Sequence, residues 1–281
     1  MHLLNLGHGY TAQALSDIVT AHGGRVTAAT RSDEKWDQLN AKGYTAKRWS
    51  DITAQDIQSA TCVLLSAAPK STGDPVFNAL PDVFRGPLPN MTWMGYLSTI
   101  AVYGDQDGGW VDESAPLTPS SARGRHRVEA EATWLGLDHL PMHVFRLGGI
   151  YGPNRGPFEK VSAGKARRII KPGQVFNRAH VEDIAEALWA SIQLPTEGEA
   201  FNIVDNEPAP PQDVLSYAAD LLNLPPLADV DFATADMSPM ARAFYDENKR
   251  VRNTKLKTLL GWQPRYPTYR EGLKAILAQS E

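Results

Sequence analysis

Cysteine is almost missing from this sequence: its 281 residues contain only Cys62, within the apolar run Cys62-Val63-Leu64-Leu65. A lone cysteine excludes a disulfide within the chain and is typical of a protein from a reducing compartment. Free cysteine in an apolar run behaves as a small hydrophobic residue, so we expect Cys62 to pack in the core. The seven histidines are scattered and no cysteine cluster exists, so no metal site is expected.

Long apolar stretches and a surplus of positive charge are also missing. No apolar run approaches the roughly 18 residues of a membrane span. No basic region with a following apolar segment and a small-residue cleavage site marks the N-terminus. The formal net charge of -4 leaves no excess of Lys and Arg to neutralise a nucleic-acid backbone. We therefore expect a cytoplasmic protein with neither a nucleic-acid nor a membrane partner.

What the first half does contain is an alternation of short apolar runs with helical patterns. Strands are indicated at 3–6, 25–29, 44–48, 62–66, 91–97 and 142–147, and helices at 12–19, 32–40, 75–85 and 121–134. Such alternation predicts an α/β fold built on a Rossmann-type, doubly wound parallel sheet.

The pattern changes after Gly152, where proline and glycine become frequent. Helices are indicated at 179–194, 211–222 and 253–260, and a strand at 201–204.

These patterns suggest how the chain divides. We expect residues 1–152 to form the Rossmann domain, with 177–204 returning to it. Residues 153–176 and 205–281 are then expected to form a smaller mixed α/β lobe over the carboxyl ends of the strands, where open α/β sheets bind ligands.

A glycine turn, Gly7-His8-Gly9-Tyr10-Thr11-Ala12, separates the first strand from its helix. Gly7 permits a tight turn, Gly9 lets the backbone approach a pyrophosphate, and Ala12 allows the helix to pack closely on the strand. The unpaired N–H groups and positive dipole end of that helix favour an anion. The motif alone is a weak signal, but its position predicts a dinucleotide site at Gly7, Gly9, Tyr10, Thr11 and Ala12.

The end of the second strand bears on which dinucleotide binds. The sequence there, Ala28-Ala29-Thr30-Arg31-Ser32, lacks the carboxylate that would accept the ribose hydroxyls of NAD. Arg31 carries a guanidinium suited to a phosphate, so NADP is favoured, with NAD possible. The alternatives are that Arg31 is a solvated loop charge, and that Asp33 or Glu34 turns inward.

Three segments resemble the extended short-chain dehydrogenase/reductase family, also called NAD-dependent epimerase/dehydratases. They are Tyr96-Leu97-Ser98-Thr99-Ile100-Ala101-Val102-Tyr103-Gly104, Arg146-Leu147-Gly148-Gly149-Ile150-Tyr151-Gly152-Pro153 and His180-Val181-Glu182-Asp183-Ile184-Ala185. The order of the matches, from Leu4 to about Val204, is more specific than any single one.

The resemblance implies a catalytic Ser or Thr, a proton-transferring Tyr, and a Lys four residues after the Tyr. Thr99 matches the first of these. The family pattern places Arg123 at the Tyr position and Arg127 at the Lys position. A guanidinium cannot exchange a proton near neutral pH, so Arg123 is not a general acid, although Arg127 remains a candidate clamp for the cofactor ribose.

Further ligand contacts are implied by the same resemblance. For the cofactor they are Asp51, Ser66, Ala67, Ala68, Thr99, Arg127, Leu147, Gly148 and Ile150. For the substrate we expect Arg178, in the loop 176–179, to meet a phosphate or carboxylate.

Other groups could replace the missing tyrosine. Tyr103 is a candidate, although the family commonly has this Tyr for structural reasons, and His126 is a weaker one. The only literal Tyr-x-x-x-Lys string, Tyr245 to Lys249, lies far outside the cofactor half, so we interpret it as a chance match.

Two functions are compatible with these features. One is an NADP-dependent oxidoreductase or epimerase/dehydratase acting on a small hydroxylated or sugar-like substrate. The other is a non-catalytic NADP(H)-binding sensor or scaffold whose conformation responds to the ligand. The intact glycine turn and Thr99 favour the enzyme, and the missing Tyr and Lys favour the sensor. A monomer and a homodimer are equally compatible with the sequence.

Overall fold

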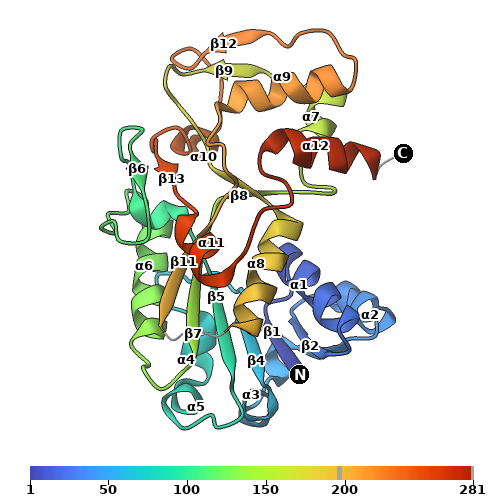
Figure 1. Ribbon diagram of the computed structural model, residues 1–281, viewed down its shortest axis with the longest axis vertical. Helices are drawn as coiled ribbons and strands as arrows, with labels where there is room; N and C mark the ends of the chain where they lie inside the picture. Colours follow the sequence, from blue (N-terminus) through green and yellow to red (C-terminus); the bar gives the residue numbers. More distant parts are fainter. Residues whose placement is uncertain (195–197, 280–281) are drawn as a thin grey trace.

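The computed structural model describes residues 1–194 and 198–279. At its centre lies a parallel sheet of seven strands in the order β11-β7-β5-β4-β1-β2-β3 (Figure 1). Its strands are β1 His2–Leu6, β2 Arg25–Thr30, β3 Thr45–Arg48, β4 Cys62–Leu65, β5 Trp93–Thr99, β7 Met142–Leu147 and β11 Glu199–Ile203. The predicted Rossmann-type doubly wound sheet is confirmed, and the strand expected at 201–204 forms one edge of it.

Helices cover both faces of the sheet. One apolar cluster joins it to α1 Tyr10–Ala21, α2 Asp33–Ala41, α8 Val181–Gln193 and α11 Thr254–Leu260. A second joins the other face to α3 Ala54–Ser59, α4 Pro75–Ala79, α5 Pro81–Arg85 and α6 Ala122–Leu135. The inner strands β1, β4, β5 and β7 are buried along almost their whole length, because both faces of a covered parallel sheet are buried. Cys62 is 1% exposed, as predicted, and burial raises the pKa of its thiol.

The single helix expected over 75–85 is wrong, because the structure has the two short helices α4 and α5 there. Between them Leu80 adopts φ -141° and ψ 53°, outside the helical region. The cause is Pro81, which has no N–H to donate and disfavours helical geometry at the preceding residue.

The upper part of Figure 1 has its own apolar cluster, formed by three helices. These are α7 Phe158–Ser162, α9 Pro211–Leu221 and α12 Tyr269–Ala278. Beside them β9 Arg168–Ile170 pairs with β12 Asp229–Asp231. The remaining short elements are η1 Trp49–Asp51, η2 Ile100–Tyr103, β6 Trp110–Val111, β8 Gly149–Tyr151, β10 Arg178–His180, α10 Pro239–Ala243 and β13 Arg250–Val251.

The strand order reverses at β1, which pairs with β2 on one side and β4 on the other. Ligands of open α/β sheets bind outside the carboxyl ends of the strands at such a switch point. Gly7, Arg31, Ser66, Thr99 and Gly148 all lie at or just beyond strand ends on this one edge. Within the ranges given above, no helix is long and apolar enough to cross a bilayer, and no cluster of His, Cys, Asp and Glu could hold a metal.

Candidate functional site

The glycine turn lies at the switch point. Gly7 has φ +104°, and a Cβ there would lie 3.0 Å from the Ala67 nitrogen and from Ser66 Oγ. Gly9 precedes α1, and a Cβ added to it would meet nothing within 4 Å. No side chain caps α1 in the described structure, so its first amides have no side-chain partner at the positive end of the helix dipole. The geometry therefore fits a pyrophosphate.

The residues after Gly9 hold the helix in place. Ala12 is fully buried against the sheet, as close packing at this position requires, and Thr11 is also buried. Tyr10 turns away from the helix axis, and its hydroxyl donates to the Pro153 carbonyl at 2.8 Å. The Arg155 guanidinium lies 5.5 Å from the centre of the Tyr10 ring. Arg155 is therefore a cation beside the glycine turn that motif reasoning missed.

His8, the middle residue of the turn, is buried behind it. Its Nε2 contacts Ser16 Oγ at 3.1 Å, and its ring packs on Tyr44. Burial lowers the pKa of His8 from 6.5 to about 4. The turn is thus supported by a neutral imidazole.

Acid is expected to weaken the fold through His8. A histidine with a depressed folded-state pKa stabilises the protein above its unfolded pKa, and this contribution is lost as the pH falls from 6.5 toward 4. Each pKa unit corresponds to about 1.4 kcal/mol, so a loss of about 2–3 kcal/mol is expected. Urea unfolding at pH 7 and pH 4.5 should show a smaller pH effect in His8→Gln than in the natural protein. Equal pH effects in both would contradict this account.

Arg31 follows β2 directly and is exposed. The carboxylate of Asp33 lies 2.9 Å from Arg48 at the end of β3, and this ion pair turns it toward the neighbouring strand. Lys35 adds a further positive charge, which acts on His8. The end of β2 therefore carries positive charge in reach of the glycine turn. Of the two carboxylates near it, Asp33 is paired with Arg48.

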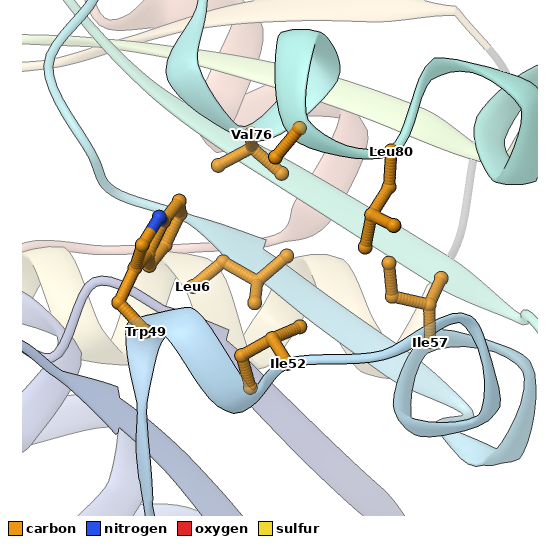
Figure 2. A pocket seen from close by; sticks show the side chains of 7 residues that line it. Leu6, Trp49, Ile52, Ile57, Val76 and Leu80 are labelled. Carbon is orange, nitrogen blue, oxygen red and sulfur yellow. The ribbon is translucent and has the colours of Figure 1, made fainter.

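An apolar cavity of about 30 Å³ lies beyond the ends of β1 and β3 (Figure 2). Trp49 and Ile52, on either side of Asp51, form one wall, and the remaining lining residues are Leu6, Ile57, Val76, Ala79 and Leu80. A space of this size holds about one water molecule. It is too small for the adenine ring of a dinucleotide, which could lie only outside it. Asp51 itself is exposed, and Ser50 donates to its carboxylate at 2.9 Å.

Two other strands, β4 and β7, end at the same edge of the sheet. Ser66 donates from its hydroxyl to the Gly7 carbonyl, and the chain continues through Ala67 to the exposed Ala68. On the far side, Leu147 is buried and Ile150 partly exposed. A Cβ at Gly148 would lie 3.0 Å from Val204 Cγ1 and 3.1 Å from the Asn177 carbonyl oxygen, so a larger residue would require these neighbours to shift. The structure brings these predicted residues to one edge, and their contact with a cofactor stays a prediction.

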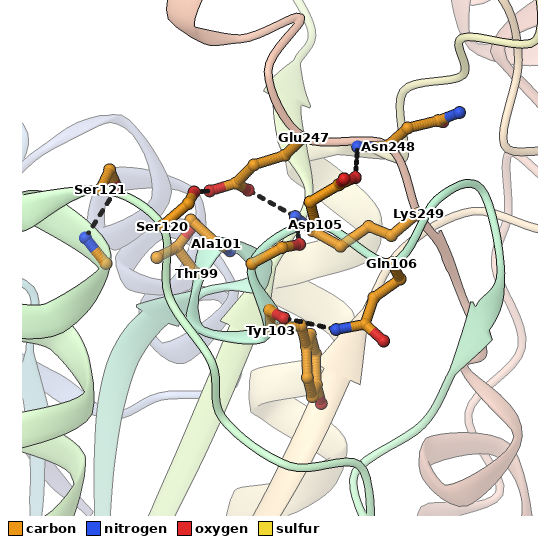
Figure 3. A network of polar contacts seen from close by, with 12 residues as sticks. Thr99, Ala101, Tyr103, Asp105, Gln106, Ser120, Ser121, Glu247, Asn248 and Lys249 are labelled. Atoms are coloured by element: carbon orange, nitrogen blue, oxygen red, sulfur yellow. Dashed lines mark hydrogen bonds and ion pairs between the residues drawn. The ribbon is translucent and has the colours of Figure 1, made fainter.

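Thr99 ends β5 and is half-buried. Its Oγ1 accepts a hydrogen bond from the Ala101 amide at 3.3 Å, which caps η2. The hydroxyl can still donate its own proton. Thr99 therefore keeps a free donor at the carboxyl end of β5 (Figure 3), and its contact with a substrate oxygen stays a prediction.

Tyr103 was a candidate to replace the missing catalytic tyrosine, but its surroundings do not fit that role. Its ring is fully buried, and its hydroxyl donates to Asn202 Oδ1 at 2.8 Å and accepts from Arg146 at 2.9 Å. Burial raises the pKa of Tyr103. With both partners in the core, this hydroxyl joins η2 to β7 and β11 rather than facing a substrate.

Arg127 also points into the core. Its guanidinium donates to the Leu97 carbonyl and, at 3.0 Å, to the Tyr96 hydroxyl, and it lies 5.4 Å from the centre of the Tyr96 ring. These partners lie two and three residues before Thr99. Arg123, at the position of the family tyrosine, is exposed in the first turn of α6. A ribose clamp by Arg127 would need the side chain to leave these partners.

Arg178 lies at the start of β10. It donates to the Phe176 carbonyl at 2.9 Å and to the Ala209 carbonyl at 3.1 Å, both from the same nitrogen. Burial lowers the pKa of Arg178, and burial raises that of the neighbouring Asp205 to about 8. Oδ2 of Asp205 has no hydrogen-bond partner in the residues that can be described. The predicted Arg178 subsite is thus a buried polar site at the junction with the upper lobe.

Lys249, which lies outside the cofactor half in sequence, contacts that half in space. Its ammonium donates to the Gly104 carbonyl at 2.5 Å, immediately after η2, although the two residues are 145 positions apart. Glu247 forms an ion pair with Lys249 and accepts from the Ser120 hydroxyl (Figure 3). The literal string therefore reaches the cofactor half, a contact that spacing alone could not show.

The fold of this chain recurs in solved structures. The structure of UDP-glucuronic acid 4-epimerase from Bacillus cereus in complex with NAD is 17% identical, with a TM-score of 0.76, and the match covers 99% of this chain and 98% of that one. The human epimerase family protein SDR39U1 with NADPH is 17% identical, also with a TM-score of 0.76, over 99% of both chains. The chain thus has the fold of NAD-dependent epimerases/dehydratases, as the three segments that resemble this family led us to expect.

Two other similar proteins carry no activity in their names. A solved structure of a functionally unknown conserved protein from Silicibacter pomeroyi DSS is 51% identical, with a TM-score of 0.95, over 99% of this chain and 98% of that one. The chain belongs to the same family as that protein. It is also 25% identical to Protein YeeZ of Escherichia coli (strain K12), over 93% of this chain and 95% of YeeZ. No family model matches the chain.

Proposed function

We propose that the chain binds NADP(H) and is an oxidoreductase or epimerase/dehydratase acting on a small hydroxylated or sugar-like substrate. The observation that carries the proposal is the uncapped N-terminus of α1 behind Gly7 and Gly9, at the switch point of the sheet. Structures of the same fold hold NAD or NADPH. When bound, a nicotinamide cofactor supplies hydride transfer, and Thr99 would polarise the substrate oxygen.

The preference for NADP rests on Arg31. A charge-assisted hydrogen bond to the 2′-phosphate is worth about 1.5–3 kcal/mol, so Arg31→Ala is expected to weaken NADP binding about tenfold to a hundredfold. NAD affinity should hardly change. Arg25→Ala, at the opposite end of the same strand, is the matched control. A thermal-shift titration in which NAD stabilises the natural protein at lower concentration than NADP would overturn the preference.

Turnover is expected to depend on Thr99. Loss of one donor to a developing oxyanion costs about a hundredfold to a thousandfold in kcat, so Thr99→Val should nearly abolish turnover. Cofactor affinity should stay almost unchanged, and Thr99→Ser, which keeps the hydroxyl, should retain most of the rate. The assay follows NADPH oxidation with a panel of aldehydes, ketones and nucleotide sugars. Full activity in Thr99→Val would remove this residue from the mechanism.

A non-catalytic NADP(H) sensor is the second candidate. It is favoured by the two arginines at the usual proton-transfer positions, because neither the exposed Arg123 nor the core-facing Arg127 can exchange a proton near neutral pH. The buried Tyr103 hydroxyl offers no replacement. The same panel separates the two candidates. Tight NADPH binding with no oxidation by any compound would support the sensor and overturn the enzyme.

A further inference from the structure

Three polar side chains from distant parts of the sequence meet beside the turn that follows Thr99. Lys249 is 6% exposed and Glu247 15% exposed, and the two form an ion pair. The Ser120 hydroxyl donates to the other oxygen of Glu247, and Lys249 donates to the Gly104 carbonyl. A chain of donors and acceptors therefore runs from Lys249 through Glu247 to Ser120 (Figure 3).

The exposed end of this series of hydrogen bonds is Ser120, which lies near the position where the family has its tyrosine. Ser120 is exposed and directly precedes the N-cap of α6, three residues before Arg123. The Ser120 amide lies 3.5 Å from the point that a Cβ on Gly104 would occupy. The first turn of α6 also packs on η2, since a Cβ at Gly124 would lie 2.9 Å from the Ala101 carbonyl. These distances place Ser120 beside η2, the turn that follows Thr99.

A role in stabilising the fold alone is a poor explanation for this polar cluster. A buried ion pair is costly to desolvate, and apolar residues of similar volume stabilise an interface at least as well. Lys249 has three N–H donors and uses two of them, on Gly104 and Glu247. Glu247 is the more exposed partner, on the side where it meets Ser120.

We propose that Ser120, Glu247 and Lys249 form the proton-transfer group of this site, in place of the missing tyrosine and lysine. The proposal rests on the proposed function. When an alcohol is oxidised, its C–H leaves as hydride to the nicotinamide cofactor with two electrons. The substrate O–H proton passes to Ser120 Oγ while the proton of Ser120 moves to the Glu247 carboxylate, and the C=O bond forms. Glu247 then releases the proton to solvent, and Lys249 positions Glu247.

The position of Glu247 can be tested without turnover, by alkylation of an introduced thiol. The only natural cysteine is buried, so a Glu247→Cys protein carries a single accessible thiol for iodoacetamide. NADPH at ten times its Kd should slow alkylation about tenfold, because about nine-tenths of the protein is then occupied. Adenosine 2′,5′-bisphosphate, which lacks the nicotinamide half, should slow it less than about twofold. The matched control Asp246→Cys, exposed on the same segment, should react equally under all conditions.

Two outcomes of this experiment overturn the proposal alone. One is a Glu247→Cys thiol that reacts at the same rate with and without NADPH, and the other is a thiol that does not react at all. Failure of the natural protein to bind NADPH would instead overturn the proposed function, and the proposal with it.

The chemical role is tested with whichever compound of the panel is turned over. General acid–base catalysis contributes about a hundredfold to ten-thousandfold, so Glu247→Gln and Ser120→Ala should each lower kcat about a hundredfold or more. The KM for NADPH should be unchanged, Ser120→Thr should restore most of the rate, and Asp246→Asn should behave as the natural protein. Full kcat in Glu247→Gln overturns the proposal and leaves the proposed function standing. A natural protein that binds NADPH but turns over no compound overturns both.

Discussion

Gly9→Asp is expected to weaken NADPH binding about a hundredfold or more while leaving the fold intact. The new carboxylate would face the cofactor pyrophosphate, and two like unit charges 4 Å apart repel by about 4 kcal/mol at an effective dielectric constant of 20. The fold should tolerate the change because Gly9 has φ -98° and a Cβ there meets no atom within 4 Å. Aspartate is moreover a favoured N-cap residue, so the helix is expected to be slightly stabilised.

The matched control for this experiment is Gly9→Ala. It adds the same Cβ without the charge, so its NADPH affinity should fall far less than that of Gly9→Asp. Both variants are measured by titration calorimetry, with thermal unfolding as the check on the fold. Gly9→Asp that binds NADPH as tightly as the natural protein would place the pyrophosphate elsewhere.

Glu131→Met is expected to lower the free energy of unfolding by about 3–5 kcal/mol, because it leaves a buried arginine without its counter-charge. Glu131 on α6 is 2% exposed and lies 2.8 Å from Arg146 on β7. The Ser98 hydroxyl also donates to Glu131, and Arg146 donates to Tyr103. Removing the carboxylate therefore disturbs the region just below Thr99.

The double variant Glu131→Met with Arg146→Met is the control. Replacing both charges by apolar side chains of similar volume is often neutral, so it should recover most of the stability lost in the single variant. Urea unfolding measures all three proteins. A loss below about 1 kcal/mol in Glu131→Met would show that water or another acceptor compensates Arg146.

The central sheet was predictable from the sequence because strands such as β1 and β4 are short apolar runs, and strands alternate with helical patterns. The glycine turn was predictable for a related reason, since its function depends on neighbouring residues and on the helix that starts there. Strands of two or three residues, such as β6 and β13, were missed because so short a segment has no periodicity. The helix α12 was also missed, although Thr268 and Glu271 form a capping box that signals its start.

The catalytic end was harder to predict because its contacts join residues far apart in the chain. The Tyr103 hydroxyl meets Asn202, 99 residues away, so its burial was not visible in the local sequence. Lys249 reaches Gly104 over a still longer separation. The Tyr-x-x-x-Lys string from Tyr245 to Lys249 lies far from Gly104 in sequence, but separation along the chain does not fix separation in space. The contact between Lys249 and η2 forms only when the C-terminal segment packs against the first half of the chain.

Binding of NADP(H) at the glycine turn is the central claim, and calorimetric titration of the natural protein with NADPH and with NADH tests it most directly. The account predicts one NADPH site per chain, with NADH bound about ten times more weakly or worse, because a phosphate contact by Arg31 is worth at least about 1.5 kcal/mol. No binding heat with either cofactor, confirmed by the absence of any thermal stabilisation, would contradict the account.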